Sequence, residues 1–315
     1  MFRMKASRVA MALVLGGCSG LAAIDPDPTP VRPTAVTQTQ VFNEGVKGFP
    51  AFEDTTITYT RANMQRSEST ATGAVARIER LDRKLVWMLD AKNKQYSECP
   101  LKGCVSPMPG KPAQKASAAG DMPREAQCRL KTGGTSITAE RTGTKRSING
   151  FDAERYDVNW LVTFRDNAAR NATGTLSIEL WTTPVTPGLE DAMALEKAYA
   201  RAHDAVSGMA TATERSLLLP IEVTRMLGSH LSEYVSPTER LNFLGGANKL
   251  AKVEGQPILI NVTWRLTGEA CAIDASIAEF AGKPLFTFRS EVKSYKLEAR
   301  HDSLFAPPKE YKRSK

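Results

Sequence analysis

Three consecutive residues near the C-terminal end, His301, Asp302 and Ser303, are the residue types that form a hydrolytic triad. In a triad the histidine takes the serine proton while the acid orients the ring, so the three side chains must converge. Neighbouring residues of a strand point to opposite faces of a sheet. We therefore expect no proton relay among them, and the sequence predicts no catalytic residue.

The other two histidines do not indicate a site for chemistry either. His203 and His230 fall in separate predicted helices, without the carboxylate or cysteine spacing of a metal site. The sequence also lacks a glycine-rich phosphate loop, a Gly-x-Ser-x-Gly nucleophile motif and a His-Glu-x-x-His motif. We predict that the protein is not an enzyme and that it holds no metal and no cofactor.

Four cysteines follow Cys18 in the chain: Cys99, Cys104, Cys128 and Cys271. In an oxidising compartment four cysteines indicate two disulfides, for which three pairings are possible. We favour Cys99 with Cys104, which closes a short turn, and Cys128 with Cys271. The alternative joins Cys104 to Cys128. A redox-active pair is disfavoured because the sequence has no Cys-x-x-Cys spacing.

The first residues have the pattern of an export signal. Arg3, Lys5 and Arg8 precede a short apolar run at residues 9–15, far shorter than the roughly 20 residues that span a bilayer. Residues 15–18 read Leu-Gly-Gly-Cys, which resembles the lipobox of bacterial lipoproteins. The resemblance implies cleavage after residue 17 and lipidation of Cys18. Several acyl chains on one residue would hold the protein firmly to a membrane.

The residue after Cys18 bears on which membrane holds the anchor. In the Gram-negative lipoproteins that this segment resembles, an aspartate directly after the lipidated cysteine favours the inner membrane. Here that position is Ser19. We therefore expect a lipid-anchored protein of the outer membrane that faces the periplasm.

Charge and composition argue against a nucleic-acid partner. Removal of residues 1–17 leaves 298 of the 315 residues and lowers the formal charge from +8 to +5, since three basic residues are lost. The remaining basic residues are spread along the chain except for a dense group at Lys309, Lys312, Arg313 and Lys315. A nucleic-acid-binding surface would need a basic stripe with interleaved aromatic residues. We expect residues 312–315 to form a solvated, frayed basic tail.

Two segments of low complexity divide the chain. Residues 18–40 contain four prolines among Thr, Asp and Gln, which predicts a semi-extended tether behind the lipidated cysteine. Residues 106–124 are rich in Pro, Ala, Lys and Gly, which predicts a surface insertion. The remainder, residues 41–311, is predicted to be a single domain.

Apolar and polar residues alternate along four runs, at 156–164, 176–180, 258–266 and 292–297. This period of two is typical of half-buried strands. Between the second and third runs, residues 189–204 and 220–234 have helical patterns, and residues 236–239, Ser-Pro-Thr-Glu, have the pattern of a helix start. The order predicts an α+β fold, in which two or three helices pack on the concave face of a curved antiparallel sheet.

Three stretches resemble an exported bacterial domain of unknown function that is related to the LolA/LolB lipoprotein carriers. They include Leu-Val-Trp-Met-Leu-Asp at 85–90, Ile-Asn-Gly-Phe at 148–151, Leu-Trp-Thr-Thr-Pro at 180–184 and the C-terminal run at 303–311. The resemblance implies a half-barrel sheet whose apolar face can hold lipid chains. It does not transfer a function, because function belongs to sites and not to folds. The chain departs from those carriers in its length, its insertion and its cysteines.

One group of large apolar residues could meet such a ligand: Trp87, Tyr156, Trp160, Phe164, Ile260 and Trp264. They would lie on the covered side of the sheet. They could simply be core, since aromatic residues dominate cores by their area. They could instead line an apolar cavity that takes a lipid or acyl chain.

Two functions from different classes remain open. The first is a non-enzymatic, lipid-anchored periplasmic module that binds an apolar ligand, either a lipid or an acylated protein. The second is a structural or assembly lipoprotein whose edge strands and loops dock an envelope partner. An apolar cavity beside Trp160 and Trp264 would favour the first function. A filled core with an exposed hydrophobic edge would favour the second.

Overall fold

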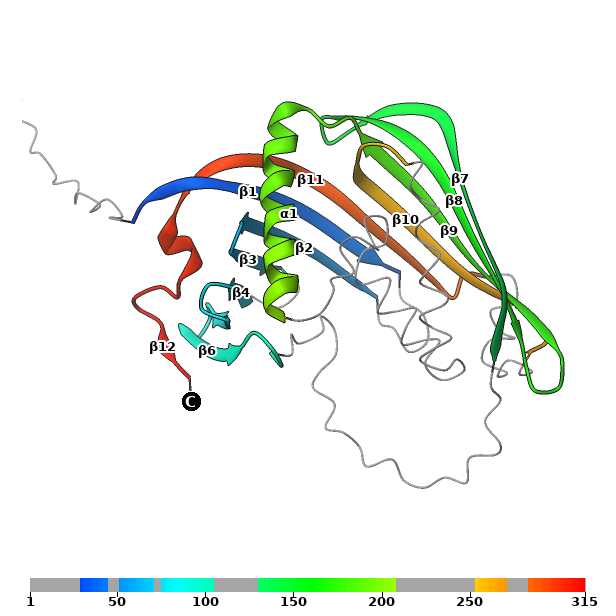
Figure 1. Cartoon of the computed structure of the whole chain (residues 1–315), viewed down its shortest axis with the longest axis horizontal. Coiled ribbons are helices and arrows are strands. Elements are labelled where there is room, and N and C mark those ends of the chain that lie inside the picture. Colours follow the sequence, from blue (N-terminus) through cyan, green and yellow to red (C-terminus); the bar gives the residue numbers. More distant parts are fainter. Residues whose placement is uncertain are drawn as a thin grey trace, which may run out of the picture.

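The computed structural model describes residues 29–44, 51–70, 75–104, 130–207, 253–270 and 283–314. These residues form a long curved sheet with one helix across it (Figure 1). The elements are β1 (Val31–Asn43), β2 (Phe52–Arg61), β3 (Met64–Ser69), β4 (Val75–Arg80), β5 (Leu85–Asp90), β6 (Gln95–Pro100), β7 (Lys131–Ile148), β8 (Phe151–Arg165), β9 (Asn171–Thr183), α1 (Pro187–Ser207), β10 (Gln256–Gly268), β11 (Phe286–His301), the short 3-10 helix η3 (Asp302–Phe305) and β12 (Lys312–Arg313).

The strands form one open sheet in the order β12-β6-β5-β4-β3-β2-β1-β11-β10-β9-β8-β7. Every neighbouring pair is antiparallel except β12 and β6. In the described part of the chain, β12 and β7 are the two edges. The predicted curved antiparallel sheet is therefore confirmed in its coarse architecture.

All four predicted strands are present, within β8, β9, β10 and β11. In β8, Tyr156, Val158 and Trp160 are buried while Asn159 and Leu161 are exposed. One face of this half of the sheet is thus covered and the other is solvated, which is the condition that produces alternation in the sequence.

Helix α1 confirms the first predicted helix. Pro187 occupies its first turn, where the missing N–H group leaves no bond unmade. The helix contacts β1, β2 and β11 (Figure 1). The other two predicted helices, at 220–234 and after Ser236, lie outside the described residues, so one helix of the expected two or three is found. No helix within the described ranges is long and apolar enough to cross a membrane.

The tether ends earlier than predicted, because residues 31–40 belong to β1 in the middle of the sheet. Pro33 is compatible with this position. It pairs only with Ala299 of β11, since the pairing of β1 with β2 begins at Ala35. A proline is tolerated where one side of the strand has no ladder bond to make. The sequence did not predict this strand because β1 contains many polar Thr and Gln residues.

The C-terminal end is also part of the sheet and not a frayed tail. The Lys312 N–H group donates to the carbonyl oxygen of Lys94 at 3.0 Å, and that of Ser314 donates to Tyr96 at 2.8 Å. Arg313 forms an ion pair with Glu98 at 3.1 Å. These bonds place β12 beside β6, so the basic charge at this end is fixed against the domain.

Arginines of neighbouring strands hold the preceding turn η3. The guanidinium groups of Arg66 and Arg80 donate to the carbonyl oxygens of Leu304 and Phe305 at 3.0 and 3.2 Å. Phe305 is fully buried, and the Arg61 guanidinium lies 4.7 Å from the centre of its ring. The segment after β11 therefore closes one face of the β2–β6 half of the sheet.

Candidate functional site

One face of the sheet carries both α1 and the largest apolar cluster. The Thr37 hydroxyl on β1 donates to the Glu196 carboxylate of α1 at 2.8 Å, and Val41 lies on the same side of β1 as Thr37. Val41 pairs with Ser290 of β11, and Ser290 pairs with Ile260 of β10. Ile260 pairs with Leu180 of β9, which pairs with Tyr156 of β8, so all of these residues lie on the same side of the sheet. We call this side the helix face and the other side the opposite face.

Five of the six predicted aromatic and apolar residues lie together on the helix face. They belong to one cluster that extends over β8, β9, β10 and β11: Tyr156, Trp160, Phe164, Ile260 and Trp264. Trp160 is 1% exposed and Trp264 0% exposed. At these two tryptophans the cluster is therefore filled, buried core.

Trp87 does not join this cluster. It lies on the opposite face, packed with Ile78, Leu89 and Phe305, and its indole N–H group donates to Glu98 at 2.9 Å. Its neighbour Val86 instead faces α1. Successive residues of β5 therefore serve two different cores, and Trp87 cannot line the same space as Trp160.

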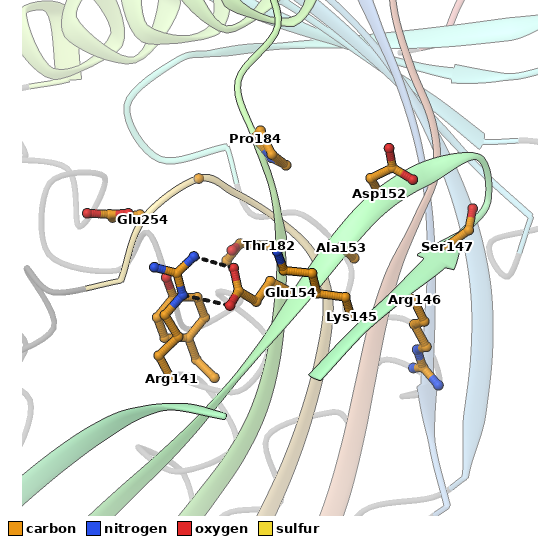
Figure 2. Close-up of a pocket in the computed structure, with 12 residues that line it drawn as sticks. Arg141, Lys145, Arg146, Ser147, Asp152, Ala153, Glu154, Thr182, Pro184 and Glu254 are labelled. Atoms are coloured by element: carbon orange, nitrogen blue, oxygen red, sulfur yellow. Dashed lines mark hydrogen bonds and ion pairs between the residues drawn. The ribbon is translucent and has the colours of Figure 1, made fainter. Parts of the chain in front are cut away.

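A cavity of about 610 Å³ lies at one end of the helix-face cluster, where the β7–β8 hairpin meets the end of β9 and the start of β10. Figure 2 shows that charged side chains project into it from several strands. Its lining consists of Arg141, Lys145, Arg146, Ser147, Asp152, Ala153, Glu154, Tyr156, Thr182, Pro184, Glu254 and Gly255. Tyr156 belongs to both the cavity and the apolar cluster. Trp160, Phe164, Ile260 and Trp264 do not line this cavity.

An ion pair organises the middle of the cavity. The Arg141 guanidinium donates from Nε and Nη2 to the two carboxylate oxygens of Glu154, at 2.7 and 2.5 Å (Figure 2). The hydrogen bond from Arg141 lowers the pKa of Glu154 below its usual value. The same bond to Glu154 raises the pKa of Arg141 further, and Glu254 adds to this effect. Both groups of the pair are therefore charged at neutral pH.

Two glycine-containing segments position the cavity walls. Asn149 and Gly150 have φ angles of 50° and 84°, which identifies a type I′ hairpin turn. The turn sets the register in which Lys145 faces Glu154. Gly255 has a φ of 88°, and a Cβ atom there would lie 2.6 Å from the carbonyl oxygen of Thr183. Only glycine fits so close to β9, and this approach brings Glu254 to the cavity.

Sequence reasoning did not identify these charged lining residues. The Asn-Gly dipeptide was the signal that could have found them. It predicts a two-residue hairpin, and the hairpin register then pairs Lys145 with Glu154 on one face.

Helix α1 is attached to the helix face through a buried carboxylate. The hydroxyl groups of Thr37 and Tyr295 donate to the two carboxylate oxygens of Glu196, at 2.8 and 2.5 Å. Burial raises the pKa of Glu196, and these two hydrogen bonds offset the rise only in part. Burial and the nearby Glu196 carboxylate also raise the pKa of Tyr295.

A second polar contact lies further along α1. The Tyr199 hydroxyl bonds to the Glu79 carboxylate on β4, and His203 Nε2 lies 3.8 Å from the same group. Arg77 pairs with Glu79 at 2.6 Å. Glu196, Tyr199 and His203 are spaced three and four residues apart, so one side of α1 presents all three to the sheet. That spacing was the signal for this contact in the sequence.

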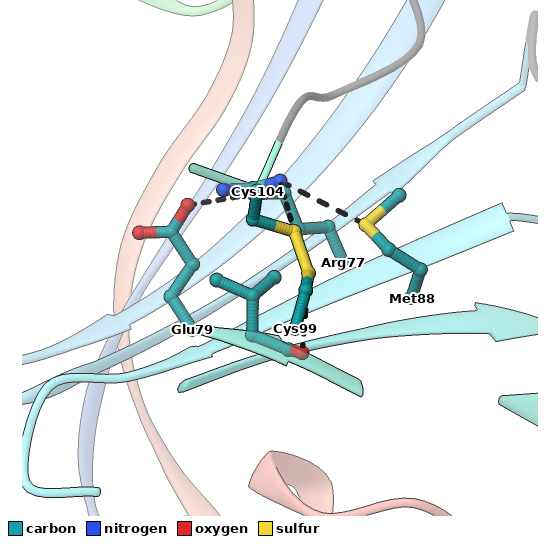
Figure 3. The surroundings of a disulfide bond; sticks show 6 residues. Arg77, Glu79, Met88, Cys99 and Cys104 are labelled. Carbon is teal, nitrogen blue, oxygen red and sulfur yellow. Dashed lines mark hydrogen bonds and ion pairs between the residues drawn. A yellow bond between two sulfur atoms is a disulfide. The ribbon is translucent and has the colours of Figure 1, made fainter. Parts of the chain in front are cut away.

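Cys99 and Cys104 form the predicted disulfide, with Cα atoms 5.6 Å apart. Figure 3 shows Arg77 reaching towards Cys104 and Met88; its Nη1 atom lies 4.0 Å from Cys104 Sγ. The bridge packs in one small cluster with Tyr199 of α1. The predicted pair Cys128 and Cys271 lies outside the described residues, as do Cys18, the insertion at 106–124 and His230.

The residues examined for catalysis are engaged in separate contacts. His301 Nδ1 lies 3.0 Å from the carbonyl oxygen of Thr29, while Asp302 pairs with Arg61. The backbone N–H group of Ser303 donates to the Thr29 hydroxyl at 3.2 Å. Within the described ranges no group of three or more His, Cys, Asp or Glu side chains is gathered in a way that could hold a metal ion.

Comparison with known proteins finds a structural similarity but does not identify a family for this chain. No family model matches the sequence. No curated protein matches it either. Among solved structures, the chain is similar to a LolA superfamily protein from Nitrosomonas europaea. The two share 7% sequence identity over 89% of this chain and 91% of that chain, with a TM-score of 0.26.

Proposed function

We propose that this chain is a non-enzymatic lipoprotein of the bacterial cell envelope that binds an apolar ligand, a lipid or an acylated protein, on the helix face of its sheet. Lipid on Cys18 anchors it to the outer membrane, facing the periplasm. The observation that carries the proposal is the meeting, at Tyr156, of a large apolar cluster with a cavity of about 610 Å³. A volume of this size is typical of small-molecule sites.

The two faces of the sheet support this assignment because they differ in chemistry. The helix face of β8–β11 carries the apolar cluster. The opposite face of the same strands carries polar and charged groups such as Arg155, Asp157, Glu179 and Asn261. The opposite face also holds a smaller apolar cluster, which includes Trp181 and Leu259. The larger apolar cluster, against which an apolar chain would gain more free energy by leaving water, lies on the helix face.

The test is binding of a fluorescent acyl probe to the purified protein. Tyr156→Ala should abolish binding because it removes the ring shared by cavity and cluster, whereas Tyr156→Phe should retain it. Phe42→Ala is a matched control, since Phe42 lies outside the cluster and is 40% exposed. A wild-type protein that shows no saturable probe binding would overturn the proposal.

One observation supports the second function, docking of an envelope partner. Strand β7 is an edge of the described sheet, and residues 135–141 form a run without a bulge between two register shifts. Such an edge can accept an added strand from another chain. Replacement of Thr138 by proline should block such pairing, because proline removes an N–H group, and should leave probe binding intact. Co-purification of an envelope protein with the wild type but not with this variant would favour docking.

A further inference from the structure

We infer that the cavity beside Tyr156 holds the headgroup of a phospholipid, and that this headgroup is a zwitterion with one phosphate and one ammonium group. The inference rests on the proposed function, because the chain of the same lipid would lie against the helix-face cluster. The inference gives the charged side chains of the cavity a role, because binding of an apolar chain to the cluster would not need them.

Side chains of both signs face the cavity and are spatially separated. Its cations are Arg141 and Lys145 and its carboxylates are Asp152, Glu154 and Glu254, whereas the Arg146 guanidinium lies 4.0 Å over the Trp181 ring. An anion would meet three carboxylates and a cation would meet two cationic groups, whereas a zwitterion can place each charge against its opposite.

The side chains of Lys145, Asp152 and Glu254 make no hydrogen bond or ion pair with the rest of the described chain, unlike Arg141 and Glu154. In Figure 2 Glu254 lies on one side of the Arg141–Glu154 pair, and Lys145, Ser147 and Asp152 lie on the other. A phosphate beside Lys145 and the Ser147 hydroxyl leaves the ammonium group free to reach a carboxylate. Charge-assisted hydrogen bonds of this kind are about twice as strong as neutral ones.

The cavity is also connected to the apolar surface. Tyr156 lines the cavity and belongs to the cluster, and Val253, next to Glu254, packs against the same cluster. Along the helix face of β7, Ala139 packs on the cluster while Arg141 enters the cavity. At two places the chain therefore passes directly from apolar packing to a charged group, which matches the boundary between chain and headgroup in a phospholipid.

The experiment measures displacement of a bound fluorescent acyl probe from the full-length protein by short-chain lipids. Phosphatidylethanolamine and phosphatidylglycerol of equal chain length are compared, with free phosphoethanolamine in a separate binding titration. The zwitterionic lipid should bind about tenfold more tightly than the anionic one, since one hydrogen bond to a charged group is worth about that factor.

The double variant Lys145→Gln, Glu254→Gln keeps the net charge and should remove the preference. Lys92→Gln, in the exposed turn between β5 and β6, should retain it. Equal displacement by both lipids would overturn this inference and leave the proposed function standing. Free phosphoethanolamine that binds as tightly as the lipid would also overturn it, because the ligand would then need no chain. Failure of every lipid to displace the probe would defeat the proposed function itself.

Discussion

The ring of Trp264 occupies the place that a side chain on Gly174 would fill. A Cβ atom built on Gly174 would lie 2.2 Å from Trp264 Cη2 and 3.0 Å from Phe164 Cε2. Gly174 pairs with Val162 on β8 and Leu266 on β10, so backbone surrounds it on both sides. The large rings of the helix-face cluster fit together because this position has no side chain.

Gly174→Ala should therefore destabilise the protein. The added methyl group must push the Trp264 ring from its place, and overpacking of this kind costs typically 1 to 3 kcal/mol. Denaturant unfolding measures the change. Gly188→Ala is the control, because Gly188 lies in α1 with no atom within 4 Å of its added Cβ. There the change should be neutral or slightly stabilising. Equal stability of Gly174→Ala and the wild type would show that the ring is not confined.

Strands β8–β11 could be predicted because one face is buried and the other is polar. Strand β5 could not be predicted in this way. Val86 packs towards α1 while the next residue, Trp87, packs against Phe305, so both faces of the strand are covered. A strand that is covered on both sides has no period of two. This also explains why Trp87 was grouped with residues of the other face.

The charged cavity could not be read from composition. Its groups come from the ends of four elements, and they meet only because the Asn149–Gly150 turn fixes one register and Gly255 permits a close approach to β9. The contacts of α1 were missed for another reason. Glu196 and His203 look like solvated helix positions, and only their spacing relative to Tyr199 indicates that they share the side turned to the sheet.

Trp160→Ala tests whether the tryptophans are core or cavity wall. Trp160 is 1% exposed and does not line the described cavity. We expect a loss of roughly 3 to 5 kcal/mol in the free energy of unfolding, the usual cost of truncating a buried tryptophan. Chemical denaturation with the acyl probe present and absent provides the measurement. A small loss together with lost probe binding would instead show that Trp160 borders a space that a ligand fills.

The Cys99–Cys104 bridge should add a modest amount of stability, since it closes a short loop. The double replacement of both cysteines by serine should cost about 2 kcal/mol. Thiol counting on the denatured, unreduced protein tests the rest of the pairing. If Cys128 and Cys271 are also joined, no thiol reacts in the processed protein. Two reactive thiols would show that only the Cys99–Cys104 bridge is present, and four would contradict an oxidising compartment.

Cys18→Ser should abolish lipid labelling and give an unprocessed or soluble product, because the lipobox depends on that thiol. Radiolabelled fatty acid incorporation and sedimentation of membranes after a high-salt wash measure this. Ser19→Asp is the companion variant, and it should move the protein from the outer to the inner membrane. A Cys18→Ser protein that still sediments with washed membranes would show that something other than lipid on Cys18 holds it.

The contact between α1 and the sheet should weaken as the pH rises. Burial raises the pKa of Glu196 in the folded protein above its value in the unfolded chain. A group of this kind contributes stability that is fully present below the unfolded pKa, near about 4.3. That contribution is lost as the pH rises through the folded pKa, because the unfolded chain then releases its proton more readily.

Glu196→Gln should remove this part of the pH dependence, because the amide stays neutral; its oxygen can accept from one of the two hydroxyls of Thr37 and Tyr295, and its NH2 group can donate to the other. Glu291→Gln provides a control of opposite sign. Burial alone would raise the pKa of Glu291, but hydrogen bonds from Lys293, Arg289 and Asn149 outweigh it and lower the pKa to about 2. The contribution of the Glu291 carboxylate to stability is present above about pH 4.3 and is lost as the pH falls towards 2. The free energy of unfolding, measured by denaturant from pH 3 to pH 9, should therefore approach the wild-type value at low pH for both variants, where the wild-type carboxyls are protonated and neutral like the amides. As the pH rises, Glu196→Gln should become more stable than the wild type, whereas Glu291→Gln should become less stable. Parallel curves of unfolding free energy against pH for Glu196→Gln and the wild type would show that titration of the Glu196 carboxyl does not affect stability.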